Sequence, residues 1–150
     1  MLRIAATNVV KSFFDAYRAR DVQRMVDMCE EMARFRSVPF EVRRRQRVIR
    51  GDGKVCTIGK ILWTGLIESF PDLTNQVTRI LADDHGNVAA EVVISGTQSK
   101  DWTTVTSRRR SFRSPHLFLF HVNDGGKIDN VTSYSDNASV RLQLGCSYVD

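Results

Sequence analysis

Residues 68–73 read Glu-Ser-Phe-Pro-Asp-Leu, and this stretch separates a helical part of the sequence from a strand-rich part. The apolar spacing before it predicts a helix from about Lys60 to Ser69, which Pro71 ends because proline has no backbone N–H to donate. Segments rich in β-branched and aromatic residues follow, separated by turn residues. We therefore expect an α+β chain in which helices come first and antiparallel hairpins come last.

Two more helices are expected before this point. The first carries an apolar stripe at i, i+3, i+4 and i+7, formed by Val10, Phe13, Phe14 and Tyr17. Asp21 is a suitable N-cap for a second, short helix whose apolar positions run from Val22 to Met32. A short strand is then predicted over residues 34–42, and the arginine- and glycine-rich stretch that ends at Gly59 is interpreted as a surface loop.

Two hairpins are predicted in the second half of the chain. Residues 73–82 and 88–97 flank one turn-rich stretch, and residues 116–122 and 127–135 flank a second that contains two glycines. The first register brings Glu91 roughly opposite Arg79, which favours a cross-strand ion pair over an inward-facing carboxylate. Asp136 follows the last strand and is interpreted as the N-cap of a final short helix.

The strand after Pro115 is apolar on both faces. His116, Phe118, Phe120 and Val122 alternate with Leu117, Leu119 and His121. We expect the first set to face a core or pocket under the helices. Because exposed apolar patches mark interfaces, we expect the second set to pack on another subunit and form a homodimer.

The size and composition suit one domain over residues 1–150. The chain is 42% apolar, and its three cysteines are scattered, which predicts unpaired thiols in a reducing compartment. No apolar run approaches the roughly 18 residues that a membrane span needs. These features predict a cytoplasmic protein with no membrane association.

The formal net charge is +5, and the excess is concentrated in two arginine clusters, Arg34–Arg50 and Arg108–Arg113. A modest basic excess of this kind is typical of a solvated surface, and no motif that organises base contacts is present in the sequence. Binding of nucleic acid or of an anionic ligand through these arginines stays as a third alternative.

The order of these elements, over about residues 5–145, resembles the SnoaL-like polyketide cyclases of the nuclear-transport-factor-two-like superfamily. The similar pieces are Phe70-Pro71-Asp72-Leu73, Gly96-Thr97-Gln98, Gly126-Lys127-Ile128 and the closing segment 136–145. The resemblance implies a cone-shaped α+β barrel, in which a curved, mostly antiparallel sheet wraps around the N-terminal helices. It also implies an apolar cavity that opens at one end.

The family's chemistry is transferred only in part. In the cyclases, an aspartate three residues before the aspartate that caps the final helix acts as acid and base in an aldol ring closure, and Ser133 stands at that position here. A serine without a partner base exchanges protons poorly near neutral pH. His116 is therefore the candidate acid or base, and Ser133 is a candidate hydrogen-bond partner of His116 or of a substrate oxygen. The alternative for His116 is a structural position at a strand end.

The candidate ligand-binding residues are aromatic or lie near the expected cavity mouth. They are Tyr17, Trp63, Gln98, Trp102, Phe118 and Phe120. For the aromatic residues, the alternative is ordinary core packing. The three histidines are too scattered to form a metal set, and we expect no metal or other cofactor.

Two functions from different classes follow. The first is a small-molecule-binding protein that acts as a cyclase, isomerase or hydratase on an apolar carbonyl compound. The second is a non-catalytic ligand-binding or protein-interaction module of the same fold, which the serine at position 133 favours.

Overall fold

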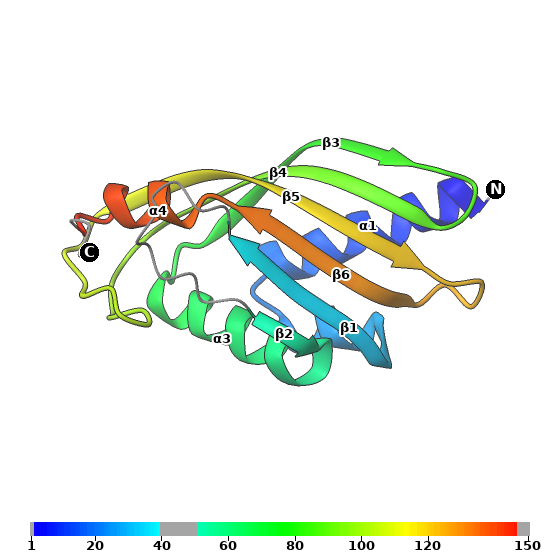
Figure 1. The fold of residues 1–150 in the computed structure, drawn as a ribbon, viewed down its shortest axis with the longest axis horizontal. Coiled ribbons are helices and arrows are strands. Elements are labelled where there is room, and N and C mark those ends of the chain that lie inside the picture. Colours follow the sequence, from blue (N-terminus) through cyan, green and yellow to red (C-terminus); the bar gives the residue numbers. More distant parts are fainter. Residues whose placement is uncertain (1, 40–50, 147–150) are drawn as a thin grey trace.

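The computed structural model describes residues 2–39 and 51–146 (Figure 1). The helices are α1 (Leu2–Arg18), α2 (Val22–Asp27), α3 (Lys60–Ser69) and α4 (Asn137–Gln143), with a π-helical turn at Val55–Gly59. The strands are β1 (Cys29–Pro39), β2 (Gly51–Lys54), β3 (Thr74–Ala82), β4 (Asn87–Thr97), β5 (Ser111–Val122) and β6 (Ile128–Ser135). The arginines of the predicted loop between positions 43 and 50 lie outside the described residues.

The six strands form one curved sheet in the order β2-β1-β6-β5-β4-β3. All neighbouring strands are antiparallel except β1 and β6, which are parallel. The long helix α1 runs behind the sheet, α3 lies below it, and α4 lies at the end opposite the hairpin turns (Figure 1). This arrangement confirms the predicted α+β fold with a bent sheet around the N-terminal helices.

The apolar stripe of α1 forms the centre of the core. Val10, Phe13 and Phe14 are fully buried, and Tyr17 is 3% exposed, as the helical spacing predicts. Their partners on the sheet include Phe118 and Phe120 of β5, which meet the phenylalanines edge to face. Edge-to-face contacts between buried rings add to the stabilisation from apolar burial.

The second helix is shorter than predicted. Asp21 caps it, since its carboxylate accepts a hydrogen bond from the Arg24 backbone N–H at 3.1 Å, but α2 ends at Asp27 and β1 begins at Cys29. The prediction that the helix continues to Met32 was therefore wrong. Along β1, the buried Ala33 and Phe35 alternate with exposed residues. The pairing of β1 with β6 fixes which of these side chains face the core.

The predicted loop before α3 is partly regular structure. Residues 51–54 form β2, which pairs with β1 so that Gly53 lies opposite Phe35, and the π-helical turn follows directly. A Cβ atom on Gly53 would lie 2.6 Å from Ile58 Cγ1, so this glycine permits close packing. The sequence analysis interpreted these glycines as loop signals, and that interpretation was wrong for residues 51–59.

The hairpin predictions are confirmed. Glu91 lies opposite Arg79 in the β3–β4 ladder, although the two side chains form no ion pair within the described residues. Instead, the Thr78 hydroxyl donates to the backbone carbonyl of Glu91 at 3.1 Å. The predicted interaction between the Arg79 and Glu91 side chains was therefore wrong, because opposite Cα positions on an exposed face do not compel long side chains to meet.

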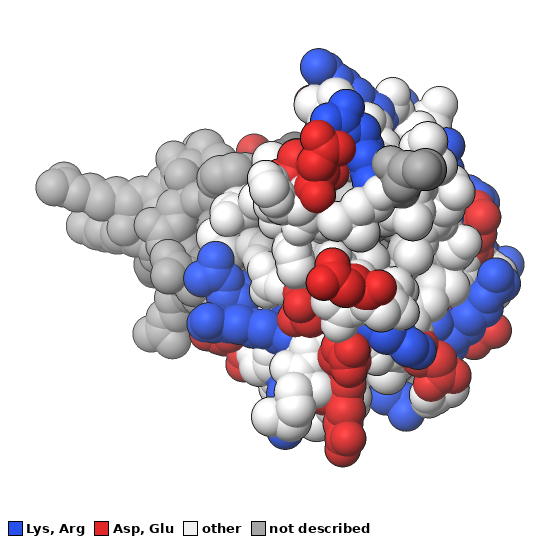
Figure 2. Space-filling model, turned by 90° about the vertical axis from the view of Figure 1, so that its right-hand side faces the viewer, with Lys and Arg blue, Asp and Glu red and all other residues white. Residues whose placement is uncertain are grey.

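Strand β5 has the two faces that its sequence predicts. Phe118, Phe120 and Val122 are each 2% exposed, whereas Leu117 and Leu119 on the other face are each 37% exposed. At the end that carries the hairpin turns, acidic and basic side chains are interspersed (Figure 2). None of the helices in the described part has the length and apolar character needed to cross a membrane.

Candidate functional site

His116 lies on the helix-facing side of β5. Its ring stacks on Phe118, with ring centroids 6.0 Å apart and an interplanar angle of 21°, and Phe118 in turn contacts Phe14 of α1 at 5.1 Å. The strand parity that predicts this orientation is confirmed. The imidazole is therefore placed beside the aromatic interior.

The backbone fixes the protonation pattern of this ring. Nδ1 of His116 lies 3.0 Å from the carbonyl oxygen of Ser114, and a carbonyl can only accept, so we assign the ring proton to Nδ1. Burial lowers the pKa of His116, and the hydrogen bond to Ser114 opposes part of that shift. The neutral ring is favoured near pH 7, with the basic lone pair on Nε2, which has no hydrogen-bond partner among the described residues.

Ser133 and His116 share the inner face but are not directly opposite. In the β5–β6 ladder, Phe118 pairs with Ser133, and His116 pairs with Ser135. Diagonal neighbours of this kind lie about 7–8 Å apart, and the structure contains no hydrogen bond between Ser133 and His116. The sequence analysis missed Ser135, whose hydroxyl donates to Asn137 Oδ1 at 3.1 Å. Counting the register outward from the glycine turn would have paired His116 with Tyr134 instead, because a register shift between His121 and Val122 displaces the pairing by one residue.

Three buried hydroxyl groups are unpaired in the described part of the chain, those of Tyr17, Ser133 and Thr132, of which Thr132 lies on the outer face of the sheet. Tyr17 is 3% exposed and Ser133 is 6% exposed, and neither hydroxyl has a hydrogen-bond partner in the described part of the chain. Within that part, Gln98 Oε1 is the single buried side-chain oxygen or nitrogen that is both unpaired and sealed from solvent. The hydroxyls of Tyr17 and Ser133 must therefore border accessible space. Burial also raises the pKa of Tyr17, which keeps its hydroxyl protonated as a donor.

The four predicted aromatic ligand residues are brought together by α1. Trp63 lies 6.4 Å from Tyr17 between ring centroids and 5.5 Å from Phe13. The ring of Phe13 also contacts the ring of Phe120, with centroids 5.2 Å apart, so Phe13 connects Trp63 with the aromatic residues of β5. All four predicted residues are buried in one core. These contacts place them around a common interior and also account for them as packing residues.

Gln98 and Trp102 belong to a different part of the core. Trp102 packs on Phe70 with ring centroids 5.8 Å apart, and Phe70 contacts Phe112 at 5.0 Å. Gln98 is fully buried, and its Nε2 donates to the Val105 carbonyl at 2.9 Å. The structure therefore places both residues where the loop between β4 and β5 is anchored to the end of α3.

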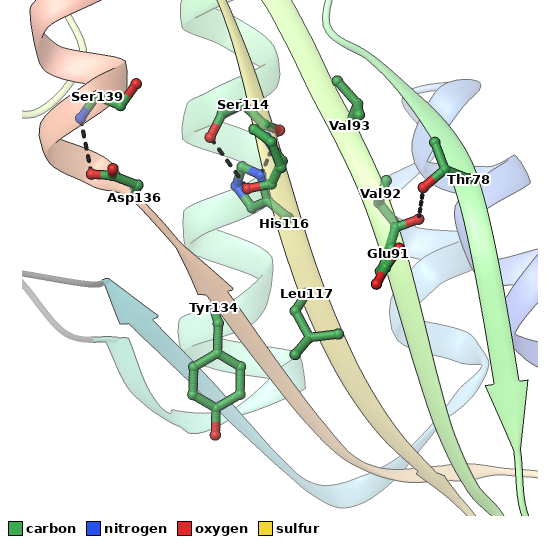
Figure 3. A pocket seen from close by; sticks show the side chains of 11 residues that line it. Thr78, Glu91, Val92, Val93, Ser114, His116, Leu117, Tyr134, Asp136 and Ser139 are labelled. Atoms are coloured by element: carbon green, nitrogen blue, oxygen red, sulfur yellow. Dashed lines mark hydrogen bonds between the residues drawn. The ribbon is translucent and has the colours of Figure 1, made fainter.

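An open pocket with a volume of about 480 Å³ lies where the sheet ends beside α4. The β5–β6 ladder stops at the pair of His116 and Ser135, and the chain then turns into α4. Figure 3 shows Asp136 and Ser139 of this turn on one side of the pocket, and Glu91 on the other side. Ser114 and His116 lie between them (Figure 3). His116 is thus positioned where the inner face meets an opening in the surface.

The remaining pocket lining comes mainly from the outer sheet face. Glu91, Leu117 and Tyr134 form one row across β4, β5 and β6, because Glu91 pairs with Leu117 and Leu117 pairs with Tyr134. Asp136 accepts a hydrogen bond from the Ser139 backbone N–H at 3.0 Å, which confirms its predicted role as an N-cap. Tyr134 and Ser139 were not predicted as site residues, since their place in one pocket depends on where α4 packs.

Potential metal ligands do not cluster in the described part of the chain. Among residues 2–39 and 51–146, no three His, Cys, Asp or Glu side chains come close enough together to hold a metal ion.

The fold is that of a known protein class. The family model of the SnoaL-like domain matches residues 10–131, so the chain belongs to the SnoaL-like family. AclR from Streptomyces galilaeus, provisionally assigned as a hydroxylase, has a similar structure, with a TM-score of 0.78 at 15% identity over 99% of this chain and 90% of that one.

Two further solved structures share the architecture. A protein from Jannaschia sp. CCS1, provisionally assigned as a SnoaL-like polyketide cyclase, has a TM-score of 0.77 at 16% identity over 98% of this chain and 96% of that one. IdmH from Streptomyces antibioticus, provisionally assigned as a polyketide cyclase, has a TM-score of 0.70 at 22% identity over 94% and 99%. At these identities the similarity establishes the fold. No curated protein matches the chain by sequence.

Proposed function

We propose that this protein binds an apolar carbonyl compound between its sheet and helices, and that His116 transfers a proton to and from that compound. The observation that carries the proposal is the hydrogen bond of His116 Nδ1 to the Ser114 carbonyl, which leaves Nε2 as the basic atom. The aromatic neighbours of His116 favour an apolar guest, and burial keeps the imidazole neutral and ready to accept a proton.

The proposed step is removal of a proton from a carbon next to a carbonyl group. The carbon–hydrogen electron pair moves to the carbonyl to form an enolate, and the proton goes to Nε2 of His116. The unpaired hydroxyls of Tyr17 and Ser133 are the candidate donors to the enolate oxygen. The resulting imidazolium returns the proton to carbon in an isomerisation, or to the new alkoxide oxygen in an aldol ring closure.

Deuterium exchange tests this step without knowledge of the natural substrate. In D₂O, the protein should accelerate loss of the α-hydrogen NMR signal of 1-tetralone, an apolar aromatic ketone. We expect His116→Gln to abolish the acceleration, because glutamine cannot accept the proton. His85→Gln, at an exposed turn position, is the matched control and should exchange like the parent protein. Unchanged exchange in His116→Gln would remove His116 from the chemistry.

The alternative function is a ligand-binding or protein-interaction module without catalysis. It is favoured by Ser133, which stands where the resemblance places the family's aspartate, and by the dense packing of Trp63 and Phe118. Under this alternative, 1-tetralone raises the melting temperature, as any ligand of the native state does, while its α-hydrogens exchange at the uncatalysed rate.

We also propose a homodimer that forms through the outer face of the sheet. Leu117 and Leu119 of β5 are each 37% exposed, and Leu81 of β3 is 54% exposed, so this face presents apolar side chains to solvent. Sedimentation at micromolar concentration should show twice the 17.1 kDa chain mass. Leu119→Lys should give the monomer, and a parent protein that sediments only at 17.1 kDa would exclude the dimer.

A cytoplasmic location is proposed on the state of the cysteines. Cys29, Cys56 and Cys146 are all unpaired, which suits a reducing compartment. Cell fractionation with an antibody against the chain tests this: recovery in the membrane or secreted fraction would contradict it.

A further inference from the structure

Two arginine side chains converge at the end of α4. Arg108 donates a hydrogen bond from Nη1 to the carbonyl oxygen of Gly145. A Cβ atom placed on Gly145 would lie 3.2 Å from Arg108 Nη1 and 3.3 Å from Arg110 Nε, so both guanidinium groups lie against the same backbone position. The two guanidinium groups carry like charges, which repel each other at close range. An anion that lies between or beside them is therefore electrostatically favoured.

No carboxylate neutralises these two side chains within the described residues. Elsewhere, the exposed arginines Arg3, Arg18 and Arg34 each form an ion pair with an aspartate. Arg110 has neither an ion pair nor a side-chain hydrogen bond among the described residues. Arg108 donates a hydrogen bond from only one of its three guanidinium nitrogens. Other exposed arginines of the described residues, such as Arg79, also have no side-chain partner, and what distinguishes Arg108 and Arg110 is that both lie against Gly145.

Among the described residues, the acidic residues nearest in sequence to Arg108 and Gly145 already accept hydrogen bonds. Asp101 accepts a hydrogen bond from the Ser107 backbone N–H at 2.8 Å, and Asp136 caps the start of α4. Arg109 and Arg113 are exposed and add further positive charge to the same segment. Arg108, Arg109, Arg110 and Arg113 therefore concentrate positive charge in this segment, and two of them, Arg108 and Arg110, lie against Gly145.

We propose that Arg108 and Arg110 form a binding site for a compact anionic group, a phosphate or a carboxylate, at the C-terminal end of α4. Guanidinium groups bind these anions through paired N–H donors, and Arg108 is already positioned by its bond to Gly145. The site lies past the end of α4, whereas the pocket beside His116 lies at its beginning, about 10 Å away along a seven-residue helix. The proposal is independent of catalysis by His116.

A compact anion is favoured over a nucleic acid by the distribution of charge. The two side chains converge on one point, whereas a nucleic-acid surface needs cations spaced along several phosphates. At the opposite end of the molecule, the basic side chains alternate with acidic ones and provide no continuation of such a surface (Figure 2).

Isothermal titration with inorganic pyrophosphate at low salt tests the site, with the Gly145 amide resonance as a local reporter. We expect Arg110→Gln to weaken binding at least about fivefold, since it removes one of two charge-assisted contacts. Arg108→Gln should have the same effect. Arg109→Gln removes an equal charge from the same segment and should change the affinity by less than about twofold. Thermal melts will show that each variant is folded; Arg110 has no side-chain partner to lose.

Three outcomes would overturn the proposal. The first is no pyrophosphate binding up to about 10 mM, a concentration that reveals even weak sites. The second is an equal loss in all three variants, which would indicate diffuse attraction without a defined site. The third is tighter, strongly salt-dependent binding of a single-stranded oligonucleotide, which would identify the segment as part of a polyanion surface.

Discussion

Nδ1 of His121 lies 2.7 Å from Oδ1 of Asp129, joining the neighbouring strands β5 and β6 near their turn. Nε2 of the same ring lies 3.0 Å from the carbonyl oxygen of His85, in the turn between β3 and β4. Both ring nitrogens therefore face acceptors, and only the doubly protonated imidazolium can donate to both. The charged form of His121 links the tips of the two hairpins.

This linkage predicts a pH-dependent contribution to stability. The hydrogen bond that His121 donates to the Asp129 carboxylate is the main cause that raises the pKa of His121 above its usual 6.5, with smaller contributions from the charge of Asp129, the His85 carbonyl and the charge of Asp83. A raised folded-state pKa means that the contribution is complete below pH 6.5 and is lost as the pH rises through the folded-state pKa. Urea unfolding should therefore show a larger stability deficit for His121→Gln at pH 5.5 than at pH 8.5.

His85→Gln is the control for this comparison, because the His85 side chain is exposed while its backbone carbonyl makes the contact. Its deficit should stay small at both pH values. An equal deficit of His121→Gln at the two pH values would show that the ring contributes by packing and not by its charge.

Two glycines should respond in opposite directions to the same substitution. Gly86 has φ +85°, and a Cβ atom there would lie 2.1 Å from the Val122 carbonyl oxygen, so Gly86→Ala should lower the free energy of unfolding by about 1–3 kcal/mol or more. Gly65 lies within α3 and has no atom within 4 Å of a Cβ position. Gly65→Ala should raise the free energy of unfolding by about 0.5–1 kcal/mol, since alanine favours the helix. Chemical denaturation measures both, and a stabilising Gly86→Ala would refute the described turn.

The cap of α4 is a third test. Asp136→Ala removes the acceptor for the Ser139 N–H and should destabilise the protein by about 1 kcal/mol. Asp136→Asn keeps an acceptor oxygen and should lose much less. If the two variants were equally destabilised in a thermal melt, the charge of Asp136, and not its capping geometry, would be responsible.

Local signals in the sequence were sufficient for much of the fold. Pro71 ends α3 at the predicted place, and the turn residues of the two hairpins set registers that put Glu91 opposite Arg79 and His116 on the inner face. The helix predicted over residues 22–32 was too long, because the apolar spacing of this segment suits a helix as well as a strand. Its actual end depends on pairing between β1 and β6, which lie about a hundred residues apart in sequence.

The candidate site was predictable only where it depends on one strand. Strand parity places His116, whereas its bond to the Ser114 carbonyl follows from backbone geometry that no residue pattern specifies. That Tyr134 and Ser139 line one pocket, and that Arg110 lies against Gly145, depends on how α4 packs against β5. Such contacts between distant segments have no local signature in the sequence.

Binding of an apolar guest between the sheet and the helices, near Tyr17, Trp63 and His116, is tested most directly by the fluorescence of Trp63. The chain has two tryptophans, and Trp102→Phe leaves Trp63 as the only tryptophan, so that excitation at the red edge of tryptophan absorption reports on Trp63 and not on the three tyrosines. Titration of this variant with 1-tetralone should give saturable quenching of Trp63 emission, whereas acetone at the same concentrations should give none that saturates. Linear quenching by 1-tetralone, equal to that of free N-acetyltryptophanamide, would contradict the claim.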